Sequence, residues 1–128
     1  MIAVSDEWRD RPRERVVGRT TLVELHGEID VLTAPAISEY LDSLTDVPKP
    51  DLLIDLQHVS FLDCRGLSVL CRARRRIRER GGRLALIIRN PPIHRMLRIT
   101  GLLDAFDVLD ACPSPVQGYS DLRVPRQG

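Results

Sequence analysis

The chain has 128 residues, enough for one domain that buries roughly two thirds of the surface of its unfolded chain. Hydrophobic residues at 43% and charged residues at 29% exclude disorder throughout, and 4% aromatic residues leave few rings for stacking nucleic-acid bases. The longest apolar run, residues 84–88, is far shorter than the about 20 residues of a membrane helix, and no apolar stretch follows Met1. We therefore expect a cytoplasmic protein that neither inserts into a membrane nor binds nucleic acid directly.

The charges are unevenly distributed along the sequence, although the net charge is only +1. Residues 64–100 contain eleven arginines and a single acid, Glu79, while the rest of the chain holds eight bases and seventeen acids. This split predicts one basic and one acidic face. The two faces could steer a charged partner, or they could attract each other within the fold.

Cysteine and histidine give no sign of a metal site or a cofactor. The three cysteines, Cys64, Cys71 and Cys112, are an odd number and have no CxxC spacing. The three histidines, His26, His58 and His94, lie in separate segments without the spacing of metal ligands. We expect reduced thiols, no metal and no cofactor.

The first third of the chain predicts a hairpin followed by a helix. Residues 1–14 are expected to form a flexible arm that ends in a strand over residues 13–17; Gly18 turns the chain into a second strand, over residues 21–26, that stops at Gly27. Thr33 precedes Ala34-Pro35 and predicts a helix start with a hydroxyl cap.

Strands alternate with helices in the remainder. After Pro48 and Pro50, residues 52–56 are expected to form a short buried strand with Asp55 near its end. Residues 61–66 should link this strand to a second helix, which stops at Gly81-Gly82. Further expected elements are a strand over 83–88, a short helix from Pro91 to Gly101 and a last strand over 105–109. This order predicts a single α/β domain over residues 15–110, with a mixed sheet of about four to five strands and three to four flanking helices, before a loosely structured tail over 111–128.

Two enzyme classes fit the sequence poorly. Cys64 begins a helix after a buried strand, as the nucleophile of a sulfur or phosphate transferase would, but the arginine needed six residues later is replaced by Leu70. An aspartate phosphoacceptor needs a lysine at a strand end, and the only lysine lies in a loop between prolines. We therefore expect Asp63 to cap the helix that starts at Cys64, and Glu28 and Asp30 to fix a turn. No catalytic residue is predicted.

A series of short motifs, in order between about Val16 and Val108, resembles the STAS domain of bacterial anti-sigma factor antagonists. The motifs are Gly27-Glu28-Ile29-Asp30, Thr33-Ala34-Pro35, Leu53-Ile54-Asp55-Leu56, Val59-Ser60-Phe61-Leu62-Asp63, Gly66-Leu67 with Val69-Leu70, Gly81-Gly82, and the stretch from Asn90-Pro91-Pro92 to Thr100-Gly101-Leu102.

The resemblance implies a binding protein and not an enzyme. It implies an antagonist that binds an anti-sigma factor, itself a serine kinase with bound ATP, and so frees a sigma factor until phosphorylation of a serine at the start of the second helix ends the binding. The position of that serine is Cys64 here, followed by Arg65, so the usual phosphoacceptor hydroxyl is missing. Ser60 and Ser68 are nearby hydroxyls at other positions.

The favoured hypothesis is an anti-sigma factor antagonist that works by partner switching without phosphorylation of Cys64. The alternative is the cytosolic STAS subunit of a lipid or anion transport complex. The predicted partner-binding residues are Asp30, Thr33, Asp63, Cys64, Arg65, Gly66, Ser68, Arg72 and Arg76.

Overall fold

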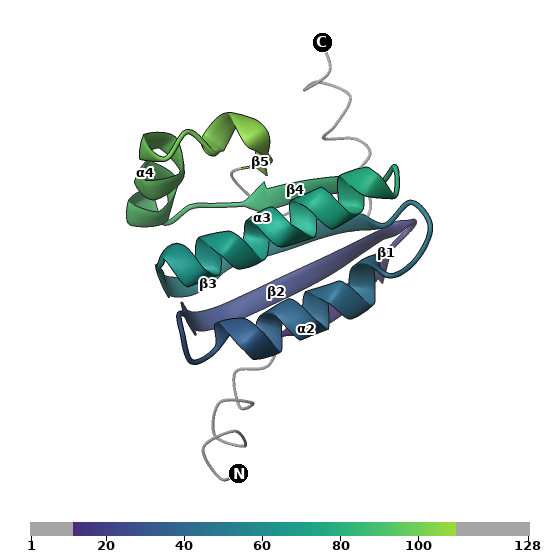
Figure 1. Ribbon diagram of the computed structural model, residues 1–128, viewed down its shortest axis with the longest axis horizontal. Coiled ribbons are helices and arrows are strands. Elements are labelled where there is room, and N and C mark those ends of the chain that lie inside the picture. The colour runs from purple at the N-terminus through teal and green to yellow at the C-terminus, as the bar shows by residue number, and fades with distance from the viewer. Residues whose placement is uncertain (1–11, 110–128) are drawn as a thin grey trace, which may run out of the picture.

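A computed structural model describes residues 12–109 of the chain (Figure 1). Its elements in chain order are β1 (Arg13–Val17), β2 (Thr20–Ile29), α2 (Ala34–Thr45), β3 (Asp51–Leu62), α3 (Cys64–Glu79), β4 (Arg83–Ile87), α4 (Pro91–Ile99), the 3-10 turn η2 (Leu103–Ala105) and β5 (Asp107–Leu109).

The strands form one mixed sheet whose spatial order follows the sequence, β1-β2-β3-β4-β5. β1 is antiparallel to β2, to which it is joined by a tight turn at Gly18 with φ of +64°, a backbone conformation that favours glycine. The other three pairs are parallel, as crossover connections through helices require. The mixed sheet with flanking helices confirms the predicted fold class.

Helices α2 and α3 lie side by side across one face of the sheet and cover the main core (Figure 1). α3 contributes a stripe of buried apolar residues at helical spacing: Val69, Leu70, Ala73 and Ile77. The apolar residues of the central strands that face this stripe are almost fully buried; they include Val23, Leu25, Ile54, Leu56 and Leu86. A second, smaller cluster consists of Leu22, Leu53, Ala85, Ile87 and Leu109.

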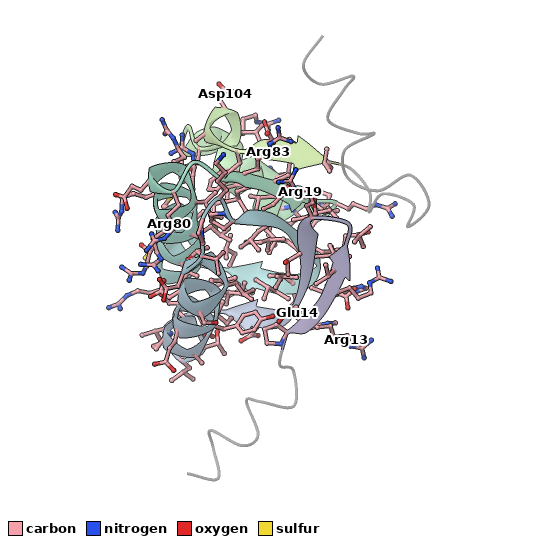
Figure 2. All side chains as sticks on the ribbon, turned by 90° about the vertical axis from the view of Figure 1, so that its right-hand side faces the viewer. Arg13, Glu14, Arg19, Arg80, Arg83 and Asp104 are labelled. Atoms are coloured by element: carbon pink, nitrogen blue, oxygen red, sulfur yellow. The ribbon has the colours of Figure 1, made fainter. Side chains whose placement is uncertain are left out.

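Local signals set the helix ends. Gly81, with φ of +69°, follows the end of α3, and Gly101, with φ of +77°, follows the end of α4, both as predicted. The Asn90 side chain accepts from the Ile93 N–H at the start of α4, over 3.4 Å. Tyr40 of α2 donates a 2.7 Å hydrogen bond to Glu14 of β1, which ties the helix to the edge of the sheet (Figure 2).

Three predicted strand boundaries were wrong, and for the ends of β2 and β3 the reason is that pairing between strands overrides local signals. β2 does not stop at Gly27: the glycine takes φ of +75° at a register shift, and pairing with β3 continues to Ile29. β3 runs for 12 residues, so Asp55 lies in mid-strand, where it is buried. Residues 61 and 62 belong to β3, and only Asp63 links it to α3. β5 starts at Asp107, since Ala105 belongs to η2.

The predicted boundaries of the arm and the tail remain predictions. Residues 1–11 and 110–128 lie outside the described part of the chain, as does Cys112. Between residues 12 and 109, no helix has the length and apolar character needed to span a membrane.

Candidate functional site

Two loops meet at the edge of the sheet where β2 and β3 end. The last residues of these parallel strands, Ile29 and Leu62, are register partners. The Asp63 N–H then donates to the Ile29 carbonyl over 3.3 Å, which joins the start of α3 to the end of β2. The sheet thereby brings together the two predicted parts of the site, one beginning at Asp30 and the other at Asp63.

The loop between β2 and α2 is held by its own side chains. The Asp30 carboxylate accepts from the backbone N–H groups of Leu32 and Thr33 at 2.9 and 3.2 Å, which confirms that Asp30 fixes the turn. Thr33 precedes α2, but its hydroxyl does not cap the helix, contrary to our prediction. It points back instead, accepting from the Asp30 N–H at 3.0 Å and donating to the Glu28 carbonyl at 2.7 Å.

The start of α3 is capped by Asp63, as predicted. One carboxylate oxygen accepts from the N–H groups of Arg65 and Gly66 at 2.9 and 3.1 Å. Gly66 is required here because a Cβ atom would overlap Leu62 Cδ1 and approach the Ile29 carbonyl oxygen to 2.8 Å. The glycine therefore lets α3 pack directly against the ends of the two strands.

Cys64, the first residue of α3, is exposed to solvent, and so is Arg65 beside it. Ser68, one turn later, donates to the Cys64 carbonyl oxygen at 3.0 Å, so its hydroxyl is bound to the backbone of α3. The structure thus presents the thiol at an accessible helix start.

Three exposed apolar residues lie in the first loop or next to the end of β3, and sequence reasoning missed them. Val31 and Leu32 in the first loop are 56% and 69% exposed, and Phe61 near the end of β3 is 49% exposed. Two consecutive apolar residues inside a polar turn were the available signal for the first pair. We call this surface, which consists of Val31, Leu32, Phe61, Cys64 and Arg65, the docking edge.

The two predicted arginines on α3 contact α2. Arg72 forms a bidentate ion pair with the Asp42 carboxylate at 2.8 and 2.9 Å. Arg76 lies 3.4 Å from the same carboxylate and donates to Thr45 Oγ1 at 2.9 Å. The hydrogen bond from Arg72 lowers the pKa of Asp42 below its usual value. Part of the basic charge of residues 64–100 therefore attracts an acidic residue within the fold, which is one of the two roles that the sequence allowed.

Two of the three histidines, which lie far apart in the sequence, are neighbours in the structure. His26 and His58 are register partners on β2 and β3, and their rings stack with centroids 5.3 Å apart. Both Nε2 atoms approach the Glu24 carboxylate, at 3.1 and 3.7 Å. Within residues 12–109, no group of three or more potential ligands is arranged to hold a metal ion.

Comparisons with known proteins agree with this architecture. The family model of the STAS domain matches residues 11–114. An anti-sigma-B factor antagonist of Bacillus subtilis is 37% identical over 86 residues, which are 67% of this chain and 78% of that protein. An anti-sigma F factor antagonist of Paenibacillus polymyxa is 29% identical over 104 residues, 80% of this chain and 86% of that protein.

A solved structure shows the same arrangement of elements. The crystal structure of an anti-sigma factor antagonist from Mycobacterium paratuberculosis superposes with a TM-score of 0.73 at 26% identity, over 83% of this chain and 90% of that one. Since the family model covers most of the sequence, the chain belongs to the STAS domain family.

Proposed function

We propose that this protein is a cytoplasmic anti-sigma factor antagonist, a binding protein and not an enzyme, that regulates sigma-factor-dependent transcription by partner switching. The names of its relatives support this role. The observation that carries it is the docking edge, where segments fixed by Asp30 and Asp63 meet and exposed apolar residues lie in or next to them. Fixed loops with exposed apolar residues favour protein docking, because little conformational freedom is lost on binding.

The proposed partner is an anti-sigma factor of the ATP-binding serine-kinase type. The predicted binding residues remain those named from the sequence, from Asp30 to Arg76, and the docking edge adds Val31, Leu32 and Phe61 to them. The fixed loops suit a surface that recognises its partner without rearranging.

The switch must differ from phosphorylation at the usual position. A phosphate at a helix start adds about two negative charges, which the positive end of the helix tolerates but a docked partner surface would not. Cys64 offers no hydroxyl there, and Arg65 carries the charge opposite to that of a phosphate. We propose that the partner is exchanged in another way and that Cys64 keeps the packing of the missing serine.

Binding to single purified anti-sigma factors of the source organism tests the docking edge. Phe61→Ser removes an exposed ring and should raise the dissociation constant by at least about tenfold, since central aromatic residues dominate interface energies. The matched control is Val16→Ser, which removes a 68% exposed apolar side chain from β1 and should change the constant by less than about twofold.

Equal weakening by the two substitutions would contradict the proposed surface. Binding to a membrane permease in place of every anti-sigma factor would contradict the proposed function and support the alternative, a subunit of a lipid or anion transport complex.

The second test concerns phosphate transfer. A serine kinase transfers phosphate to a positioned hydroxyl, so the wild-type chain should not be labelled from ATP at Cys64. Cys64→Ser restores the oxygen, but Arg65 can still displace it, and a misplacement of about 1 Å costs about a hundredfold in rate. We therefore expect Cys64→Ser with Arg65→Ser to accept labelled phosphate better than either single variant.

Mass spectrometry of the labelled peptides provides the control. Labelling of the wild-type chain at Ser60 or Ser68, or equal labelling of the wild-type chain and the double variant, would show that phosphorylation persists by another route.

A further inference from the structure

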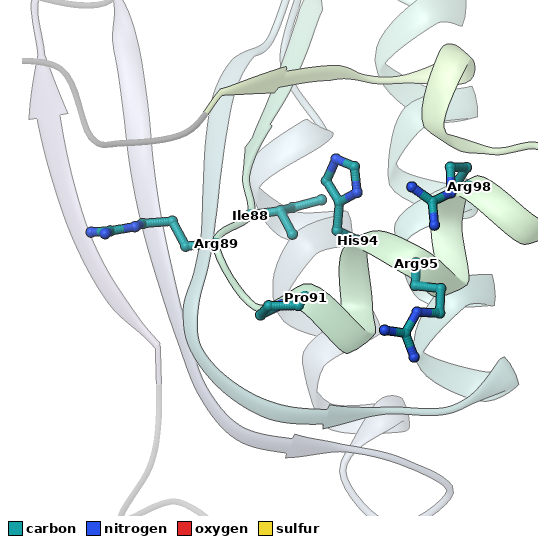
Figure 3. A pocket seen from close by; sticks show the side chains of 6 residues that line it. All are labelled: Ile88, Arg89, Pro91, His94, Arg95 and Arg98. Atoms are coloured by element: carbon teal, nitrogen blue, oxygen red, sulfur yellow. The ribbon is translucent and has the colours of Figure 1, made fainter.

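A pocket of about 480 Å³ lies where the chain leaves β4 and enters α4 (Figure 3). It shares no residue with the docking edge. Half of the residues that line it are arginines; the lining consists of Ile88, Arg89, Pro91, His94, Arg95 and Arg98. Ile88 is buried, while the three arginines are exposed. Neither aspartate nor glutamate is among the lining residues.

The arginines of this pocket differ in their partners from the three arginines that approach the segment 42–46. Arg72, Arg76 and Arg80 each approach an aspartate of the segment 42–46 within 4 Å. In the described part of the chain, by contrast, none of the pocket arginines forms a salt bridge. Guanidinium groups left without a carboxylate keep their donors for an external anion, and their planar fork fits phosphate and carboxylate oxygens.

Side chains and not the helix terminus form the cationic surface. Pro91 and Pro92 have no N–H group, and the Ile93 N–H is taken by the Asn90 side chain. His94 and Arg98 lie one turn apart on α4, as do Arg95 and Arg98, so the three residues belong to one side of the helix. In Figure 3 the His94 ring and the Arg95 guanidinium extend from this helix in different directions. Arg89 extends away from them and lies at the rim.

We propose that this pocket binds a small oxyanion with two or more negative charges, made of phosphate or carboxylate groups. Arg95 and Arg98 each carry a planar fork of N–H donors, enough for two such groups, and His94 adds a further donor. The volume falls within the range of about 300–1,000 Å³ that is typical of small-molecule sites, so the pocket has room for a ligand larger than inorganic phosphate. This site is independent of the anti-sigma partner and of the docking edge.

The test is a titration of the full chain with pyrophosphate and, separately, with citrate at constant ionic strength, followed by NMR of the backbone amides. We expect saturable shifts at His94, Arg95 and Arg98. Saturation by pyrophosphate alone assigns the site to phosphate compounds, and saturation by citrate alone assigns it to carboxylates. Shifts that remain linear up to about 10 mM with both anions would overturn the proposal.

A pair of matched double variants separates a built site from general attraction. Arg95→Gln with Arg98→Gln should raise the dissociation constant at least about tenfold, because charge-assisted hydrogen bonds are lost. Arg75→Gln with Arg78→Gln removes the same charge from exposed positions of α3 and should change the constant less than about twofold. Equal weakening by both pairs, with circular dichroism showing both folded, would also overturn the proposal.

Discussion

Asp51, at the start of β3, carries its charge where the fold disfavours it. Burial raises the pKa of this carboxyl above its usual value, against the opposing effects of a hydrogen bond from Thr20 and of the charges on Arg83 and Arg19 (Figure 2). One carboxylate oxygen is buried without a hydrogen-bond partner. Folding therefore disfavours the charged form of Asp51 relative to its protonated form.

We predict that Asp51→Asn stabilises the protein at neutral pH, by on the order of 0.5–1 kcal/mol. Because the folded pKa is raised, the wild-type chain loses stability as the pH rises from the unfolded pKa through the folded pKa, and the amide does not. Urea unfolding at pH 7 should give the variant the higher midpoint, and the difference should shrink below pH 4. An equal gain from Asp104→Asn, at an exposed carboxylate, would contradict this explanation.

Single-residue roles could be predicted from the sequence where the contact is local. Asp63 caps the helix two and three residues ahead of it, and this offset is visible in the sequence. The stacking of His26 on His58 depends on the register of two strands 32 positions apart in the chain, which no local pattern encodes. Thr33 was predicted wrongly because its hydroxyl finds partners in the preceding loop and not in the helix that follows.

At the level of the elements, α2 and α3 are joined by the contacts of Asp42. The hydrogen bond from Arg72 lowers the pKa of Asp42, with further lowering by the charges of Arg72 and Arg76, while burial opposes it. A lowered folded pKa means that this stabilisation is present above the unfolded pKa and is lost as the pH falls through the folded pKa.

We predict that Asp42→Asn lowers the melting temperature at neutral pH by no more than about 5 °C, since exposed ion pairs contribute little. The difference from the wild-type chain should vanish in acid, where the wild-type carboxyl is protonated, and should decrease at high salt. Thermal unfolding followed by circular dichroism measures both effects. Asp46→Asn is the control, since Asp46 is 75% exposed and meets Arg80 only at 3.6 Å. A pH-independent difference would contradict the ionic explanation.

The element order was predictable because helices and parallel strands leave clear periodic patterns, whereas strand lengths were not. β3 has 12 residues but was predicted to cover only residues 52–56, because Asp55 looked like a strand end. In the structure its carboxylate accepts from the Gln57 N–H at 2.8 Å and from the Gln57 side chain at 3.1 Å, so it is satisfied inside the strand. Likewise, the apolar part of the docking edge appeared only when folding placed Val31, Leu32 and Phe61 around one edge.

For the molecule as a whole, contacts within the fold reduce the basic charge of residues 64–100 that can face a partner. Eleven arginines occupy residues 64–100, but Asp42 neutralises part of the positive charge of Arg72 and Arg76. Arg72 is still 43% exposed over its side chain, so it can contact both α2 and a partner. Charges at the edge of an interface mainly change the association rate.

We predict that the association rate with the anti-sigma factor decreases between ionic strengths of about 0.02 and 0.15 M, because salt screens the attraction. Arg72→Gln with Arg76→Gln should slow association at low salt, both by removing two positive charges and by leaving Asp42 without its partners. Asp42→Asn should accelerate it, since both arginines then keep their full positive charge. Stopped-flow measurements compare the three proteins directly.

The decisive control is the variant Arg72→Gln with Asp42→Asn, which removes one charge of each sign and leaves the net charge unchanged. If long-range attraction determines the rate, this variant should match the wild-type rate within about twofold. If Arg72 itself contacts the partner, association should stay near the wild-type rate while dissociation becomes faster. An association rate that does not respond to salt, or that falls in Asp42→Asn, would show that the basic half of the chain serves the fold and not the approach of a partner.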